Sequence, residues 1–428
     1  MTQVPADASS KLRPCPLAPQ RLGHLARRLS HQERDVGTED ATSKSGKGVR
    51  GTVVRMNAVR AALCLAFGAA LLVACAALAG AQSADRARPR TISKHAAALT
   101  GIACTSPNSC MAVGDYYSEP PLRHGTLVSR WNGRAWQRER APLVGPVGIV
   151  GVAVSCPVAR RCVAVSTSGA MAWNGTRWTS QRGVTGSAVS CPSARFCAAV
   201  GTQGLALSSS IWRDGRWTRE RVPLPTPPTP IGSITLAGVS CTSQDFCLAV
   251  GDYSYPAEAQ PSAGHRDVPL AELWNGNAWR LVPPAAPTAL AVLRAVSCRS
   301  PRFCVAVGTQ RARSTLVERW TGKDWQVQAS PNPSAVGYSV LDAVACPSTR
   351  TCEAVGTYNG GSLVAESWRK DRWVLQRVRT PRPMSGSPAL SCPSTRACVL
   401  VGAVGGLPMS QTWDGRRWVV RSTPRPPR

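Results

Sequence analysis

The stretch SAVSCPSARFCAAVGTQGLALSSSIWRDGRW, residues 187–217, shows a pattern that recurs seven times along the chain. In each copy, two cysteines six residues apart precede two tryptophans five residues apart. All 14 tryptophans and 14 of the 17 cysteines belong to it, and a repeat of this length determines the architecture before the chemistry of any single residue. The pairs are Cys104/Cys110, Cys156/Cys162, Cys191/Cys197, Cys241/Cys247, Cys298/Cys304, Cys346/Cys352 and Cys392/Cys398, and Trp131/Trp136, Trp173/Trp178, Trp212/Trp217, Trp274/Trp279, Trp320/Trp325, Trp368/Trp373 and Trp413/Trp418.

Each copy is predicted to contain four short strands. One apolar run ends at the first cysteine and a second, such as CAAVG at 197–201, begins at the second cysteine. Both runs are about five residues long and bounded by turn residues, which favours strands over helices. Asn-Gly or Asp-Gly between two tryptophans indicates a further hairpin. Each repeat is therefore expected to form two hairpins.

Successive first cysteines are 35 to 57 residues apart, a spacing typical of propeller blades. We predict an all-β protein, a seven-bladed β-propeller of four-stranded antiparallel blades, with the tryptophans packed between neighbouring blades. A long β-solenoid is the structural alternative, but its coils do not use two tight hairpins per repeat. The propeller is placed at 99–423, with blades at about 99–140, 149–182, 187–222, 236–283, 293–329, 341–379 and 389–423.

The paired cysteines are candidate site residues because each pair is predicted to form a disulfide across a short turn. Two cysteines on facing strand ends are within bonding reach, and each such bond is worth about 2.4 kcal/mol by loop entropy. Metal binding is the competing interpretation, but no repeat has a histidine at a fixed position and no cofactor is expected. Buried free thiols are the third interpretation, which would suit a cytosolic protein.

The first 98 residues contain no repeat. Residues 1–55 are polar and are predicted to be a disordered tail, or an extension before a true start at Met56. Residues 56–81 include an uncharged apolar run after Arg60, expected to form one apolar helix as a signal peptide or a membrane anchor. A lipoprotein box ending at Cys75 is a third alternative. Residues 82–98 are interpreted as a linker and 424–428 as a tail.

Whether the segment is a signal peptide, an anchor or a lipoprotein signal, the repeats are expected beyond the membrane. The predicted location is therefore secreted or attached to the outer face of the cytoplasmic membrane. Export makes disulfides the preferred state of the paired cysteines. The exported residues 82–428 carry 40 basic and 18 acidic side chains, a net charge of +22. Such a surface attracts anionic polysaccharides, nucleic acid or lipid headgroups, although a sequence rich in Ala, Arg, Pro and Gly also fits the bias of a G+C-rich genome. No element that reads nucleic acid is recognisable, and we expect no specific nucleic acid partner and a monomer.

The cysteine and tryptophan hairpins are expected on one rim of the propeller, and connections of variable length on the other. From second cysteine to first tryptophan the separation is longest in the fourth and first repeats. These two connections are expected to be loops, and loops on a rigid scaffold commonly bind ligands. Tyrosines beside carboxylates suit carbohydrate recognition, with solvated, tolerated insertions as the structural alternative. The candidate binding residues are Tyr116, Tyr117, His124, Tyr253, Tyr255, His265 and Tyr358, beside Asp115, Glu119, Asp252 and Glu258.

No catalytic motif accompanies these residues. The sequence has no G-x-S-x-G, no H-E-x-x-H and no P-loop. A glycosidase needs two carboxyl groups roughly 5–10 Å apart, and spacing along the chain does not establish that distance. Binding is therefore expected ahead of catalysis.

The repeat resembles the blades of Asp-box (BNR-like) propellers, found in sialidases, sortilin-like receptors and photosystem II stability factors. It is also similar to exported actinobacterial proteins with SCPSxxxCxAVG and WNGxxW units. Asp214, Gly215 and Trp217 approach the Asp-box S-x-D-x-G-x-x-W, as do Asp414, Gly415 and Trp418, and Asn174 begins a variant. The leading serine is missing from its place, and most repeats replace the aspartate. The resemblance implies a fold and no activity, because the arginines and the Tyr/Glu pair of a sialidase cannot be matched.

These observations predict an exported envelope module that binds a polysaccharide or an envelope protein through the variable rim. A polysaccharide hydrolase or lyase on the same rim, and a purely structural surface protein, are the alternatives.

Overall fold

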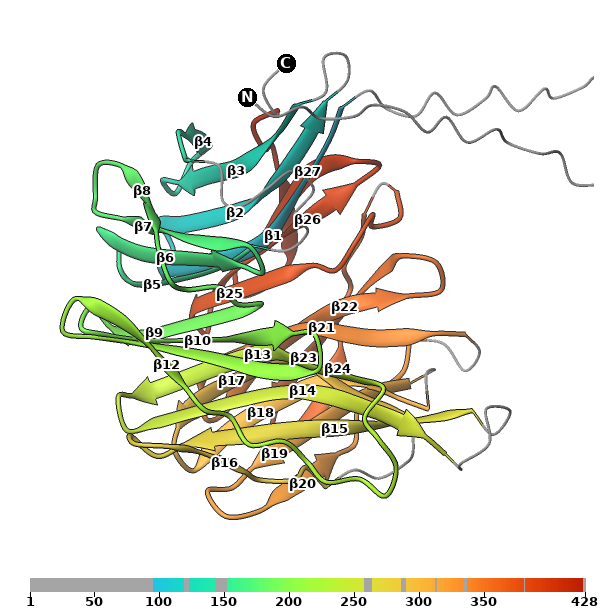
Figure 1. The fold of residues 1–428 in the computed structure, drawn as a ribbon. Helices are drawn as coiled ribbons and strands as arrows, with labels where there is room; N and C mark the ends of the chain where they lie inside the picture. The colour runs from blue at the N-terminus through green and yellow to red at the C-terminus, as the bar shows by residue number, and fades with distance from the viewer. Residues whose placement is uncertain are drawn as a thin grey trace, which may run out of the picture. The chain divides into compact units, whose positions relative to one another are not determined.

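A computed structural model of the protein describes residues 95–118, 123–142, 152–257, 264–285, 290–311, 314–333, 337–380 and 382–425. Within these residues, 28 strands form seven antiparallel sheets of four strands each (Figure 1). The propeller predicted from the sequence is thus confirmed. The expected tail, signal or anchor segment and Cys75 lie outside the described residues. In the described part, no helix is long and apolar enough to cross a membrane.

Each blade uses four strands that are consecutive along the chain. Blade 1 consists of β1–β4: His95–Ser106, Ser109–Ser118, Arg123–Trp131 and Trp136–Glu139. Blade 2 consists of β5–β8: Ala153–Val158, Arg161–Ser166, Gly169–Trp173 and Trp178–Gln181. Blade 3 consists of β9–β12: Ala188–Ser193, Phe196–Gln203, Ala206–Arg213 and Arg216–Glu220. Blade 4 consists of β13–β16: Ser233–Ser243, Phe246–Pro256, His265–Trp274 and Trp279–Leu281.

The remaining blades repeat this order. Blade 5 consists of β17–β20: Ala291–Ser300, Phe303–Gln310, Ser314–Trp320 and Trp325–Gln328. Blade 6 consists of β21–β24: Ser339–Ser348, Thr351–Tyr358, Ser362–Arg369 and Arg372–Leu375. Blade 7 consists of β25–β28: Ala389–Ser394, Ala397–Val404, Leu407–Trp413 and Trp418–Arg421.

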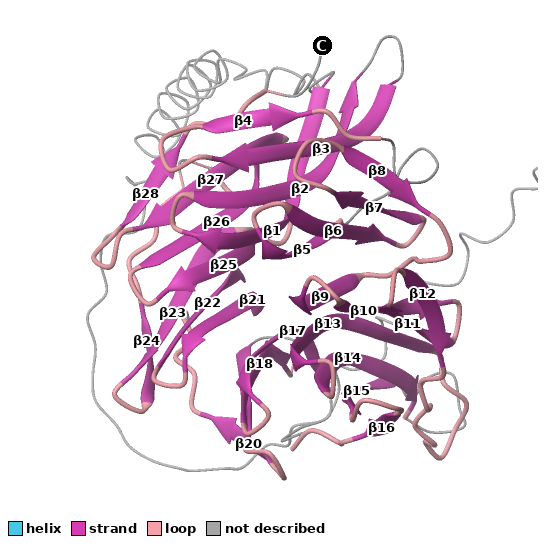
Figure 2. Ribbon diagram, turned by 90° about the vertical axis from the view of Figure 1, so that its left-hand side faces the viewer, coloured by secondary structure: helices cyan, strands magenta, loops and turns pink. Residues whose placement is uncertain are grey.

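The first strands of the blades form the inner ring of the propeller. Each of them contacts the first strand of the next blade, and β25 of blade 7 contacts β1 of blade 1 (Figures 1 and 2). At this closure the N–H of Ala97 donates to the carbonyl of Gly406 at 2.9 Å, and Trp136 Nε1 donates to Ser410 Oγ at 2.8 Å. Because no strand is shared between the ends of the chain, these lateral contacts close the ring.

One end of every blade carries the cysteines and tryptophans in adjacent register. In blade 4, Cys241 lies opposite Cys247, Cys247 opposite Trp274, and Trp274 opposite Trp279. The second cysteine faces the first tryptophan in all seven blades. All seven disulfides join the cysteines six residues apart. The cysteine and tryptophan hairpins therefore share one rim, called here the cysteine rim; the opposite rim is called the variable rim.

The predicted pairing is confirmed, and the second cysteine of each disulfide belongs to the hydrophobic core. These side chains are at most 3% exposed, and each packs in a cluster of buried apolar residues. The residues are Cys110, Cys162, Cys197, Cys247, Cys304, Cys352 and Cys398. All seven are structural residues, because the second cysteine opens the buried strand beside the first tryptophan.

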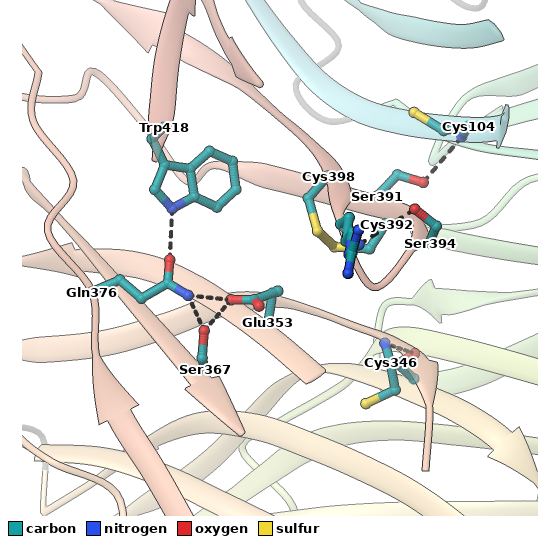
Figure 3. The surroundings of a disulfide bond; sticks show 12 residues. Cys104, Cys346, Glu353, Ser367, Gln376, Ser391, Cys392, Ser394, Cys398 and Trp418 are labelled. Carbon is teal, nitrogen blue, oxygen red and sulfur yellow. Dashed lines mark hydrogen bonds between the residues drawn. A yellow bond between two sulfur atoms is a disulfide. The ribbon is translucent and has the colours of Figure 1, made fainter. Parts of the chain in front are cut away.

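The serine before a first cysteine links its blade to the next. Ser240 Oγ of blade 4 accepts a hydrogen bond from the N–H of Cys298 in blade 5 at 2.9 Å. Ser391 of blade 7 likewise accepts from Cys104 of blade 1 at 3.0 Å, across the closure (Figure 3). The same bond is made by Ser155, Ser190 and Ser297. Blades 1 and 6 have Ala103 and Ala345 at this position, so the hydroxyl acceptor is missing there.

The tryptophans fill the core between neighbouring blades. Trp274 and Trp279 of blade 4 pack with Phe196, Ile211 and Val222 of blade 3 in one buried cluster. Trp279 Nε1 also donates to Ser209 Oγ of blade 3 at 2.9 Å. The polar end of an indole needs such a partner when the ring is buried. The repeated tryptophans thus form contacts between blades, as the sequence predicted.

Candidate binding site

The tyrosines and histidines of the two long connections lie in strands and not in loops. Tyr117 pairs with His124 between β2 and β3, and Tyr255 pairs with Arg266 between β14 and β15. The expectation of loops was wrong because these hairpin ladders continue well beyond the length that is common in the other blades. Glu119 and Glu258 lie outside the described residues. The aromatic residues are therefore held by cross-strand hydrogen bonding.

Three of the seven candidate residues occupy one equivalent position and pack between blades. Tyr116, Tyr253 and Tyr358 each stand two residues after the glycine of the second strand. Each is partly buried and packs against the core shared with the preceding blade. The ring of Tyr116 also occupies the space that a Cβ on Gly125 would need. For these three tyrosines, the structure gives a packing role.

The other four candidates lie further along the same two hairpins of blades 1 and 4, at the variable rim. Tyr255 stacks on Tyr253 with ring centroids 6.0 Å apart, and His265 Nε2 lies 3.7 Å from Asp267 on the same hairpin. On blade 1, the rings of Tyr117 and His124 are 5.1 Å apart. Blades 1 and 4 are not neighbours in the ring, so the structure forms two separate aromatic hairpins rather than one site.

Charged residues of blades 4, 5 and 6 interact with one another around the inner strand β17. Arg294 is exposed at a β-bulge of the inner strand β17. Its charge acts on Asp252 of blade 4 and on Asp342 of blade 6, which occupies the same bulge position in β21. Thr235 Oγ1 donates to Asp252 at 2.9 Å, and Ser387 Oγ donates to Asp342 at 2.8 Å. We call Asp252, Arg294 and Asp342 the inner charged cluster.

Both carboxyl groups of this cluster are harder to ionise than free aspartate. Burial raises the pKa of Asp342 to about 6, opposed by the Ser387 hydrogen bond and by the Arg294 charge. Burial also raises the pKa of Asp252, with the Thr235 hydrogen bond and Arg294 acting against it. Among the described residues, Asp342 Oδ2 is shielded from solvent and has no hydrogen-bond partner. The cluster thus offers an exposed cation beside a carboxyl group with one oxygen that lacks a hydrogen-bond partner.

Sequence reasoning found Asp252 but missed Arg294 and Asp342. The signal was present four residues before the first cysteine, where these two charged residues replace the uncharged Thr100, Ser187 and Ala237 of other blades. Variation in the length of the connections does not point to this position, because it lies in an inner strand. Within the described part of the chain, no group of three His, Cys, Asp or Glu side chains is arranged to hold a metal ion.

Comparison with known proteins gives a similarity of structure alone. No model of a known protein family matches the sequence, and no curated protein sequence matches it. In structure the chain is similar to YCF48 from Cyanidioschyzon merolae, at 13% identity and a TM-score of 0.45 over 72% of this chain and 94% of that one. It is also similar to a fucose-specific lectin from Aleuria aurantia (12%, TM-score 0.43, 76% of this chain and 95% of that one) and to the Hadza microbial sialidase Hz136 (10%, 0.44, 76% and 66%).

Proposed function

We propose that this protein is an exported binding module of the cell envelope that recognises a polysaccharide or an envelope protein through the variable rim of blades 4 to 6. The observation that carries the proposal is that one strand, β14, carries both the stacked Tyr253–Tyr255 pair and Asp252 of the inner charged cluster. Ring faces of this kind suit the apolar face of a sugar or an aliphatic side chain. Arg294 supplies donors for anionic groups, and the two carboxyl groups accept from hydroxyls.

Export rests on the seven disulfides and on the apolar segment at 61–81. Disulfides persist in oxidising compartments and are rare in the cytosol. A secreted chain, or one attached to the outer face of the membrane, meets envelope polymers directly. The net charge of +22 on residues 82–428 favours anionic ones. Cell fractionation tests this part of the proposal, and recovery of the reduced protein from the cytoplasm would contradict it.

A polysaccharide hydrolase or lyase at the same rim is the second candidate. It is favoured by the Asp342 carboxyl group, because a pKa of about 6 suits a general acid near neutral pH. The second carboxyl group, Asp252, is influenced by the same arginine. Binding and catalysis differ in one readout, the release of sugar from the polymer.

The test is a binding titration of the purified, disulfide-intact chain with a teichoic acid and a neutral glucan, with released sugar measured in the same samples. Arg294→Gln and Tyr255→Ala are each expected to weaken binding at least tenfold, with no sugar released. Arg302→Gln is the matched control, because Arg302 is exposed in blade 5 at the cysteine rim and is expected to change binding less than twofold.

Equal binding by Arg294→Gln and the parent protein would exclude this part of the rim as the site. Release of sugar that depends on Asp342 would replace the binding module with an enzyme. The chain could bind none of these polymers and instead bind an envelope protein in a way that depends on Arg294. The variable rim would then still be the binding site, and the ligand would be a protein.

A further inference from the structure

A cavity of about 110 Å³ opens between blades 2 and 3 at the cysteine rim, opposite the surface proposed above. Trp212 and Trp217 of blade 3 form one wall, and Ala172, Thr179 and Gln181 of blade 2 form the other. Arg161 also lines the cavity, and no acidic side chain does. The pocket is mostly apolar with a few polar groups at its edge, as small-molecule sites commonly are.

The cavity exists because two residues that fill other interfaces are absent from this one. Blade 3 presents Phe196 and Ile211 to the tryptophans of blade 4, and blade 4 presents Phe246 and Leu273 to those of blade 5. The same two positions in blade 2, before the second cysteine and before the first tryptophan, hold Arg161 and Ala172. Ala172 is the smallest of the seven residues at its position; the others are Arg130, Ile211, Leu273, Arg319, Ser367 and Thr412.

The chain leaving blade 2 also lacks a side chain at one position that contributes to the core of other interfaces. Five residues after the second tryptophan, blades 1, 3 and 6 have Ala141, Val222 and Val378, which pack on the core of the next interface. Blade 2 has Gly183 there, with a φ of +76° and no atom within 4 Å of where a Cβ would stand. At this position the connection to blade 3 therefore places no side chain over the tryptophans, and the next residue, Val184, packs in the core cluster that Trp212 and Trp217 contact.

As a result, the blade 3 tryptophans remain open to ligand. Trp212 and Trp217 are partly exposed, with rings 5.6 Å apart, whereas Trp274 and Trp279 of blade 4 are 1% and 5% exposed. Both blade 4 indoles donate hydrogen bonds, to Gln244 and to Ser209. Within the described part of the chain, the indole N–H groups of Trp212 and Trp217 have no such partner.

We propose that this cavity, here called the blade 2–3 pocket, binds one hexuronic acid residue of an anionic polysaccharide. The sugar ring lies against the two indoles, and its carboxylate pairs with the exposed Arg161 guanidinium, which forms no ion pair among the described residues. Charge complementarity selects the ligand, since an arginine without a competing carboxylate favours an acidic sugar over a neutral one. Two unpaired N–H donors and Gln181 are available to its hydroxyls.

The experiment titrates the disulfide-intact chain with a tetramer of galacturonic acid, followed by calorimetry and by tryptophan fluorescence. Ala172→Ile places in blade 2 the side chain that blade 3 uses at the same position, so it is expected to fill the pocket while preserving the fold. Both Ala172→Ile and Arg161→Gln should weaken binding at least tenfold, with unchanged melting temperature or a higher one. Thr412→Ile, a substitution at the equivalent position of blade 7, should leave the affinity within twofold.

Three results would overturn the proposal: unchanged affinity in Ala172→Ile and Arg161→Gln, equal affinity of the parent chain for maltotetraose, or an equal loss in Thr412→Ile. The outcome is independent of the rim proposed above, because Arg294→Gln should not affect binding of the tetramer. A loss in Arg294→Gln alone would support the variable rim and reject the blade 2–3 pocket.

Discussion

Glu272 is a buried carboxyl group without a partner at the interface between blades 3 and 4. It is 0% exposed, and neither carboxyl oxygen has a hydrogen bond among the described residues. Glu318 and Glu366 hold the same position in blades 5 and 6, and each accepts a bond at 2.8 Å from the chain that leaves the preceding blade. The corresponding chain after blade 3, residues 223–230, contains five prolines, which have no N–H to donate. Burial therefore raises the pKa of Glu272 to about 8.

This pKa predicts a protein that loses stability as the pH rises. The ordinary value of the Glu272 pKa is 4.5, so unfolding between pH 4.5 and about 8 releases a proton from this group. The contribution of neutral Glu272 to the free energy of unfolding is complete below pH 4.5 and is lost as the pH rises towards 8. Burial raises the pKa of Glu366 to about 8 as well, so its contribution has the same sign. We expect the free energy of unfolding to fall between pH 5 and pH 8.5, by at most about 1.4 kcal/mol per pH unit for each group.

Glu272→Gln stays neutral throughout this range and should show a shallower fall. Urea denaturation at pH 5, 7 and 8.5 measures the slope, and Glu272→Gln/Glu366→Gln should be shallower again. Equal slopes for the parent and both variants would show that these groups ionise normally in the folded state.

In five of the seven blades, the serine before the first cysteine joins the first strand to that of the next blade. Removing one of these acceptors leaves a backbone N–H at the interface without its partner, which costs about 1–3 kcal/mol when the group is buried. Ser240→Ala should therefore lower the free energy of unfolding by about 1 kcal/mol or somewhat more, because Cys298 loses its acceptor.

Ala345→Ser is the converse change, because blade 6 lacks the serine that blades 2 to 5 and 7 provide. It should stabilise the protein through a new bond to the N–H of Cys392. Chemical denaturation of the two variants compares the effects directly. Destabilisation by both would mean that the alanine blades are packed in a way that excludes the hydroxyl.

The strand pattern could be predicted from the sequence because it depends on local signals. Cysteines and tryptophans mark strand ends, and glycines such as Gly215 (φ +84°) mark a turn. The site was harder to predict. Tyr253 was expected in a loop, and only the cross-strand pairing of β14 with β15 shows it packed in a ladder. Arg294 and Asp342 are brought close by inner strands of different blades, a relation that spacing along the chain does not contain.

The spacing of the cysteines predicts their pairing but not their burial. Their pairing follows from a separation of six residues, but the two members of a pair differ in burial. Cys304 is 0% exposed, whereas its partner Cys298 is only partly buried. This difference depends on which end of the hairpin faces the next blade, and the sequence does not state that.

The blade 2–3 pocket was also only partly predictable from the sequence. Ala172 and Gly183 are visible in the sequence as small residues at positions where other repeats have larger ones. Their consequence depends on which face of blade 2 lies against Trp212, and this follows only from the packing of one blade on the next.

The seventh interface closes the whole molecule, and it does so without a strand contributed by the other end of the chain. Trp136 Nε1 of blade 1 donates to Ser410 Oγ of blade 7, both buried. Ser209 makes the same bond inside the chain, between blades 3 and 4. Blades 3 and 4 stay connected by backbone if their bond is lost, whereas blades 1 and 7 do not.

Ser410→Ala should therefore increase hydrogen exchange across all the strands of blades 1 and 7. Ser209→Ala is the matched control and should affect blades 3 and 4 less, at a similar cost in stability of about 1–3 kcal/mol for the orphaned indole N–H. Mass spectrometry of peptides from each blade measures both. Equal exchange in the two variants would mean that the closing interface is no weaker than the others.

Because every blade is one continuous stretch of chain, the ring has no blade that must come first. New termini placed between blades 4 and 5, with the present ends joined by a linker, would preserve all 28 strands and all seven disulfides of the described residues. The order of blades in the gene and their order around the axis are then separable, so circularly permuted forms of this propeller are compatible with the same three-dimensional structure.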